Sequence, residues 1–401
     1  MIYLITNRKT RAKTMKKIDI KSFLKNEIVT VISFGLAVIS LLIVPIDGQY
    51  MEYIDFRTLA ILLSLMLVVA GFRKLGVFKS IGSWLLTKSK NARELVLVFV
   101  LLCFGFSMLI TNDVALITFV PFAMEVLYMA ELEKYLIPAI VLETIAANLG
   151  SMFTPIGNPQ NLYLYSLSGM GMGKFLLLML PYSLASFFGL LVATVLLIKK
   201  EPLSVSAFSS TRITKMDEES EKNEAPQMAL LVVYTFLFLL CLVTVARLVP
   251  YYVVLAVVLM IVLLFDRATI GEADYFLLLT FLFLFVFIGN MGRIPQVNSW
   301  LSSIVQGHAA LTGILCSQVI SNVPAAILLS GFTTSYEELI VGVNLGGLGT
   351  LIASMASLIS YKFYSKDKDS KVMLYLGQFT VLNLIFLLML CGIYALMQWM
   401  V

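Results

Sequence analysis

The chain has 401 residues, of which 60% are hydrophobic and 13% are charged. Soluble domains are about 45–50% apolar and about 25% charged, so this composition excludes a soluble enzyme, a nucleic-acid-binding protein and a disordered chain. The net charge of +5 requires no nucleic-acid partner, because membrane proteins gather basic residues in their cytoplasmic loops.

Long apolar segments predict an all-α polytopic membrane protein. A helix that crosses the bilayer needs about 20 mainly apolar residues. The predicted spans, in chain order, are 28–46, 54–72, 135–168 (interrupted), 174–198, 227–247, 250–265, 275–291, 336–361 (interrupted) and 372–398. Two further apolar stretches, 94–130 and 309–334, carry a polar cluster near the middle. We expect them to be re-entrant hairpins, which enter and leave the membrane on one side.

Basic residues predict the orientation. With a cytoplasmic N-terminus, all Lys and Arg residues fall on the cytoplasmic side except Arg57, Lys174, Arg247 and Arg293. This asymmetry predicts a multi-pass protein of the plasma membrane with its C-terminus outside. The chain divides into a basic cytoplasmic segment (1–27), a first repeat (28–198), a polar cytoplasmic linker (199–226) and a second repeat (227–401).

The two repeats share sequence features that occur in the same order in both. Amphipathic segments 73–91 and 293–308, which we expect to lie on the membrane surface, share a Ser-Trp-Leu string. A hairpin tip and an interrupted span also occur in each repeat. The first hairpin follows an even number of spans and the second an odd number. The repeats are therefore predicted to be inverted, as in many secondary transporters.

Each hairpin tip carries hydroxyl and amide side chains. Thr111-Asn112-Asp113 in the first hairpin returns as Ser321-Asn322-Val323 in the second, each with a serine four residues upstream (Ser107 and Ser317). Hydroxyl, amide and freed carbonyl oxygens are hard ligands suited to Na⁺. A helix that begins after the tip favours an anion at its N-terminus. The alternative is that these side chains only cap helix ends.

Helix-breaking residues interrupt one span in each repeat. The string Thr154-Pro-Ile-Gly-Asn-Pro-Gln-Asn161 contains two prolines and a glycine, which disfavour a continuous helix. Its counterpart, residues 346–350, unwinds through glycine, and that string is also compatible with simple helix packing. Packing does not explain why Asn158 and its amide neighbours occur beside two prolines at membrane depth.

Two carboxylates within the predicted membrane segments stand out. Asp113 is at a hairpin tip, where we hypothesise a charged cation ligand in preference to a proton carrier or a helix cap. Glu143 is inside a span, where pairing across a helix interface is the favoured role. No Lys or Arg falls at the level of the tips, so an anionic substrate would rely on helix dipoles, amides and bound Na⁺.

These residues resemble the ion-transporter superfamily, which includes divalent-anion/sodium symporters and arsenite permeases. The strings at 154–161 and 321–324 are similar to its citrate-transporter-like permeases. The resemblance, over about residues 28–398, implies a homodimer that works by an elevator movement. It implies one or two Na⁺ ions as the only cofactors, held by Ser107, Thr111, Asn112, Ser151, Ser317, Ser321, Asn322 and Gly347. Residues implied to face the substrate are Asn112, Asp113, Thr154, Pro155, Asn158, Asn322, Val323 and Thr350.

The sequence departs from the resemblance at the third position of each tip. Asp113 and Val323 stand where the related dicarboxylate symporters have threonine. A carboxylate repels a dianion unless it is protonated or paired with a cation, so smaller, less charged or metal-complexed substrates stay open.

We therefore expect a non-enzymatic secondary transporter in the lipid bilayer that carries a small anion, a carboxylate or an inorganic oxyanion, coupled to Na⁺ or H⁺. The alternatives are a Na⁺/H⁺ exchanger that uses Asp113, an arsenite-type efflux permease, and a channel or a subunit of an ATP-driven pump. No nucleotide-binding string occurs in the chain.

Overall fold

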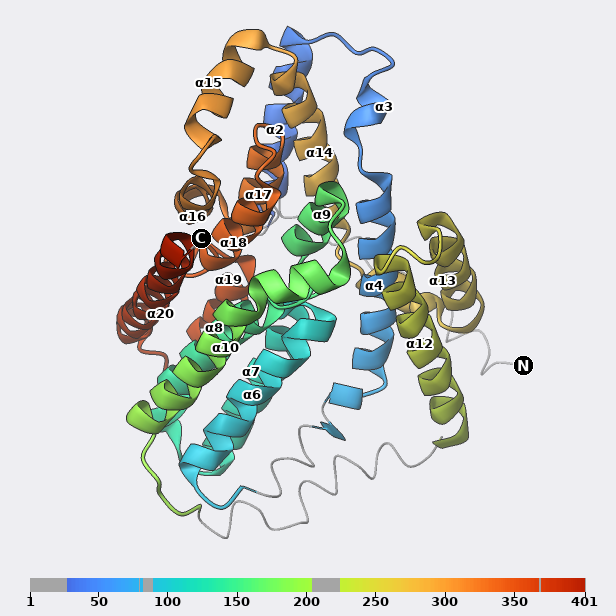
Figure 1. The fold of residues 1–401 in the computed structure, drawn as a ribbon. Coiled ribbons are helices and arrows are strands. Elements are labelled where there is room, and N and C mark those ends of the chain that lie inside the picture. The colour runs from blue at the N-terminus through green and yellow to red at the C-terminus, as the bar shows by residue number, and fades with distance from the viewer. Residues whose placement is uncertain (1–26, 79, 82–88, 204–223, 368, 401) are drawn as a thin grey trace, which may run out of the picture.

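A computed structural model of the chain describes residues 27–78, 80–81, 89–203, 224–367 and 369–400. The predicted all-α membrane fold is confirmed, because these residues form helices and no strand (Figure 1). The helices are α2 (Ile28–Ile43), α3 (Tyr50–Tyr53), α4 (Phe56–Lys74), α6 (Ala92–Ile110), α7 (Asn112–Met129), η2 (Glu133–Tyr135), α8 (Leu136–Ser151), α9 (Pro159–Ser168), α10 (Met172–Leu197), α12 (Glu224–Val245), α13 (Tyr251–Phe265), η5 (Arg267–Glu272), α14 (Tyr275–Gly292), α15 (Pro295–Val305), α16 (Ala309–Ile320), α17 (Asn322–Ser330), α18 (Tyr336–Leu345), α19 (Met355–Ser365) and α20 (Val372–Met400).

The helix boundaries follow the predicted membrane segments closely. By length and apolar composition, seven described helices could each cross a membrane, and α2 and α13 are shorter apolar helices. Both predicted hairpins are pairs of helices, α6 with α7 and α16 with α17. Both predicted interruptions are present, between α8 and α9 and between α18 and α19.

Some predicted segments fall partly outside the described residues. This holds for the N-terminal segment, for the linker and for the first surface helix at 73–91, which includes residues 79 and 82–88. The second surface segment is described as the amphipathic helix α15, and the chain bends by 107° between α15 and α16.

Side-chain caps explain where several helices begin. Asp55 and Asp274 start α4 and α14 by accepting hydrogen bonds from the backbone nitrogens of Thr58 and Leu277, both at 3.0 Å. Asn158 starts α9 in the same way, and Pro159 takes the first helical position, where no N–H is needed. The polar string after the first break therefore restarts a helix inside the protein.

The hairpins and broken helices form the interior of the molecule. Helix α6 packs on α8 and α16 packs on α18, while α19 lies against α7 and α8, and α9 lies against α17 and α18. The two halves thus interlock through their broken helices. Figure 1 shows the first hairpin in the lower half of the view and the second in the upper half.

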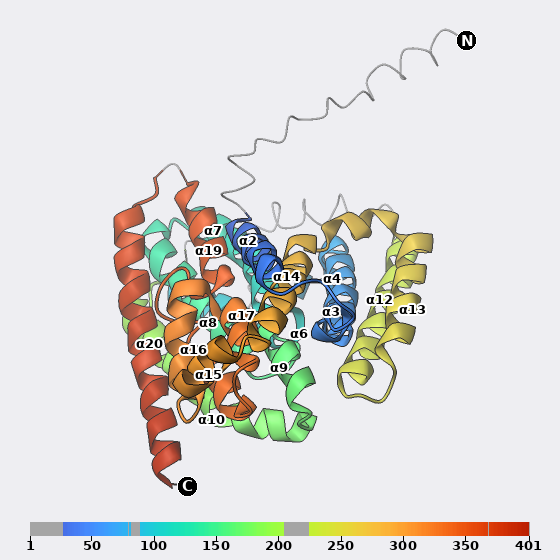
Figure 2. The ribbon, with the colours of Figure 1, turned by 90° about the horizontal axis from the view of Figure 1, so that it is seen from above.

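Outer helices present apolar side chains to the surroundings. Figure 2 shows α20 along one edge and α12 with α13 along the opposite edge. Several leucines on the outer helices are largely exposed, namely Leu42 on α2, Leu196 on α10 and Leu388 on α20. Such exposure is expected for side chains that face lipid rather than water.

Candidate substrate and ion site

The two hairpin tips have the same strained backbone. Thr111 has φ 76° and ψ 148°, and Ser321 has φ 74° and ψ 154°. Residues other than glycine rarely adopt this region, and strain of this kind concentrates at functional sites. Each tip is fixed to the break in its own half, because the backbone nitrogens of Asn112 and Asn322 donate to carbonyl oxygens there, at 3.1 and 2.9 Å.

The first tip continues into a buried amide network. Asn112 Nδ2 donates to Asn148 Oδ1 at 3.0 Å, and Ser354 Oγ donates to the same oxygen at 2.9 Å. Asn148 Nδ2 in turn donates to Ser357 Oγ at 3.3 Å. Asn148 therefore joins the first tip to the start of α19, which belongs to the second half.

An equivalent network runs in the opposite direction. Asn344, in the second half, accepts from Asn158 Nδ2 at 3.1 Å and donates to Asn161 Oδ1 at 2.6 Å. Asn344 follows Asn148 by 196 positions, and the same spacing relates the partners of the two asparagines. The asparagine before each break thus binds the residues that restart the helix in the other half.

The serines below the tips lie against glycines of the broken helices. A Cβ atom added at Gly150 would be 2.5 Å from Ser107 Oγ, and one added at Gly346 would be 2.8 Å from Ser317 Oγ. Both serine hydroxyls are buried and donate to carbonyls of their own helix. Only glycine leaves this space beside each hydroxyl.

An amide side chain holds the freed carbonyls of each break. In the first break, Asn161 Nδ2 donates to the carbonyls of Ser151, Met152 and Thr154 at 3.4, 3.2 and 3.1 Å. In the second, Gln318 Nε2 donates to the carbonyls of Gly346 and Leu348 at 2.8 and 2.9 Å.

Gln318 is a site residue that the sequence reasoning missed. Its Oε1 also accepts from the backbone nitrogen of Thr350 at 2.9 Å, and its backbone carbonyl accepts from Thr350 Oγ1 at 3.1 Å. Thr154 makes the matching side-chain bond to the carbonyl of Met108. The available signal was that glutamine replaces methionine at the aligned position of the second hairpin.

The remaining predicted residues are placed as follows. Ser151 Oγ accepts from Asn158 Nδ2 at 3.2 Å and so pairs within its own break. Pro155 is buried, and Ser321 Oγ lies 3.5 Å from the carbonyl of Ala353. Gly347 abuts the Asn322 amide, since an added Cβ would be 2.9 Å from Nδ2.

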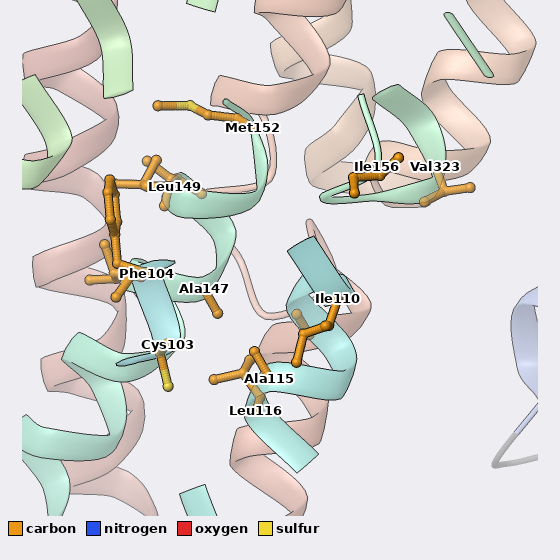
Figure 3. Packing of buried hydrophobic residues seen from close by; sticks show 14 of the residues in the cluster. Cys103, Phe104, Ile110, Ala115, Leu116, Ala147, Leu149, Met152, Ile156 and Val323 are labelled. Atoms are coloured by element: carbon orange, nitrogen blue, oxygen red, sulfur yellow. The ribbon is translucent and has the colours of Figure 1, made fainter. Parts of the chain in front are cut away.

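The residues at the third position of the two tips, Asp113 and Val323, differ in polarity. Asp113 is half-buried, and its carboxylate makes no hydrogen bond or ion pair with the residues that the structure describes. Val323 is buried within the apolar core. Figure 3 shows the apolar side chains around the tips, with Ile110, Ala115 and Leu116 of the first hairpin below the level of Val323.

Glu143 lies apart from the tips. It is fully buried on α8, and its Oε2 accepts from Cys103 Sγ on α6 at 3.6 Å, which is a contact across a helix interface. No group of three or more His, Cys, Asp or Glu side chains that could hold a metal occurs among the described residues. A cation here would be held mainly by neutral oxygens.

Residues 21–338 match the family model described as "Citrate transporter". The chain is 33% identical to an uncharacterized transporter of Methanocaldococcus jannaschii, over 82% of this chain and 87% of the relative. It is 30% identical to the inner membrane protein YbiR of Escherichia coli, over 77% and 80%. A silicon efflux transporter of Oryza sativa is 32% identical, over 36% of this chain and 29% of the relative.

Proposed function

Because the chain belongs to the citrate transporter family, we propose that this membrane transporter carries a small anion, a carboxylate or an inorganic oxyanion, by secondary transport coupled to Na⁺. The observation that carries the proposal is the matched pair of hairpin tips. Each joins a strained hydroxyl residue to an asparagine that begins a helix and is tied to a broken span.

The tips supply hydrogen-bond donors for an anion. Helices α7 and α17 begin at Asn112 and Asn322, so the positive ends of both helix dipoles lie at the tips. The Asn322 amide makes no hydrogen bond within the described part of the chain, so it is free to bind a ligand. No Lys or Arg lies at either hairpin tip or at either break, which favours a substrate of low charge.

The oxygens beside the tips suit Na⁺ as the co-transported ion. Ser107 and Ser317, with carbonyls of the adjoining breaks, offer neutral oxygens of the type that hard cations prefer. Asp113 adds a negative charge beside the first tip and forms no ion pair with any Lys or Arg that the structure describes. A bound Na⁺ would balance this charge while an anion occupies the amides.

The arrangement of the halves supports an elevator movement of inverted repeats, and we propose that two copies of the chain form a homodimer. The hairpins and broken helices interlock as one interior body, while α4 packs with α12 and α13 at one edge. Movement of the interior body past that edge would carry the tips between the two sides of the membrane.

Uptake by purified protein in vesicles tests the proposal. An inward Na⁺ gradient should accelerate the uptake of at least one labelled anion from a panel of citrate, succinate, phosphate and arsenate. Asn322→Ala should abolish this uptake, whereas Asn298→Ala on the surface helix α15 should preserve it. Gradient-independent uptake, or full activity of Asn322→Ala, would contradict the proposal.

Two alternatives have their own supporting observations. The unpaired carboxylate of Asp113 favours a Na⁺/H⁺ exchanger, which would move Na⁺ against a pH gradient without any organic or inorganic anion. The Oryza sativa relative is a silicon efflux transporter, which favours an arsenite-type permease for small uncharged oxyacids. Including arsenite and silicic acid in the same panel distinguishes the second alternative.

A further inference from the structure

A cavity of about 620 Å³ lies apart from the hairpin tips, where α10 and α18 begin and α20 ends. None of its lining residues belongs to a tip or to a helix break. The side chains that give it its chemistry are Lys174, Tyr182, Tyr336, Glu337, Glu338 and Tyr394. By the predicted topology, this cavity opens at the external face of the membrane.

The cavity has an unbalanced negative charge. Lys174 and Glu337 form an ion pair with each other and so neutralise one another. Glu338 is the neighbouring carboxylate, and it forms no ion pair with any residue that the structure describes. An anion would be repelled by this carboxylate, whereas a cation of single charge would complete the site.

The walls are aromatic. Tyr182, on α10, lines the cavity, and its hydroxyl forms no hydrogen bond with the described residues. Tyr336 and Tyr394 add two further aromatic rings, and Leu178 and Val341 add apolar surface. An accessible hydroxyl that no described residue binds is available to a ligand.

We propose that this cavity binds an organic cation with an ammonium group. Tyrosine rings attract such cations through their negative faces, and a nearby carboxylate adds to the attraction. A bare inorganic cation would make no use of the apolar walls. A phospholipid with an amine headgroup and a free alkylammonium compound share this chemistry, so the experiment must separate the two sources.

Choline binding to the full chain in detergent tests the chemistry. Saturable binding should occur by titration calorimetry, and Glu338→Gln should weaken it at least about tenfold, because the cation loses its charged partner. Tyr182→Phe should also weaken binding, without a change in thermal stability, since the tyrosine hydroxyl forms no hydrogen bond with the described residues and can pair with the choline hydroxyl. Glu52→Gln and Tyr252→Phe, which remove matching groups outside the cavity, should leave binding unchanged.

Choline binding in two lipid compositions distinguishes a lipid headgroup from a free amine as the bound cation. In nanodiscs of phosphatidylethanolamine, loss of choline binding relative to phosphatidylglycerol nanodiscs would support the proposal with a lipid headgroup as occupant. Equal binding in both would support it with a free amine as occupant. Absence of saturable choline binding in detergent and in both nanodiscs, or an unchanged affinity in Glu338→Gln, would overturn it.

Discussion

The two hairpin tips share a backbone but not their side-chain bonding. Asn112 donates to Asn148 and accepts from the backbone nitrogen of Asp113, so its amide is fully engaged in the protein. Asn322, at the second tip, has only backbone bonds and a glycine, Gly347, against its amide. Equivalent residues therefore differ in their bonding, because the Asn112 amide is held by the protein whereas the Asn322 amide forms no hydrogen bond with the described residues.

The largest effects are expected from removing the asparagine side chain at each tip. Asn112→Ala and Asn322→Ala should both abolish transport in vesicles, because each removes a central polar contact. Only Asn112→Ala should also lower the free energy of unfolding, by about 1 kcal/mol, since only Asn112 loses a side-chain hydrogen bond. Thermal unfolding in detergent measures this difference, and equal stability losses would show that the tips are bonded alike.

Asp113→Asn should separate cation binding from proton transfer. With the negative charge removed, Na⁺ affinity should fall at least about tenfold and transport should be lost at every pH. Direct Na⁺ binding and uptake between pH 5.5 and pH 8.5 measure the two effects. If Na⁺ binding were unchanged and only the pH dependence of uptake disappeared, Asp113 would be a proton carrier instead.

Gly347→Ala should test whether the Asn322 amide binds the substrate. The new methyl group would lie 2.9 Å from Asn322 Nδ2, the end of a side chain that can move away. Substrate affinity should therefore fall, by about tenfold, while stability stays near that of the natural chain.

Gly346→Ala is the matched control for that substitution. Its methyl group would meet Ser317 and the backbone of Ile314 at 2.8 and 2.9 Å. Overpacking of this kind costs about 1–3 kcal/mol of stability. If Gly347→Ala destabilised the protein as much as Gly346→Ala, the space beside Asn322 would be ordinary packing space.

The smallest effects are expected from single cysteines at the two hairpin openings. Glu131→Cys and Thr334→Cys should keep transport activity, because both positions are exposed. A membrane-impermeant maleimide should label Glu131→Cys only from the cytoplasm and Thr334→Cys only from outside, with the natural chain as the unlabelled control. Labelling of both from one side would contradict the inverted arrangement.

Local patterns predicted most of the fold. Apolar length located the helices, and the recurring polar strings located both tips and both breaks within a few residues. These features are local because helix formation and helix breaking depend on neighbouring residues.

Local patterns could not predict which residues form hydrogen bonds with each other within the site. Ser357 bonds to Asn148 across 209 positions, and Asn158 bonds to Asn344 across 186 positions. No local periodicity reports such contacts. Gln318 was missed for a related reason, because a glutamine within an apolar helix gives no sign of which unwound carbonyls it will bind.

The crossed asparagine bonds have a consequence for biosynthesis. While only the first half of the chain has been inserted, Asn148 lacks its serine partners and Asn158 and Asn161 lack Asn344. Unsatisfied amides at membrane depth are costly, so the first half should wait in the membrane as a loosely packed intermediate. Assembly would then be completed by the last helices to leave the ribosome, and neither half expressed alone should mature.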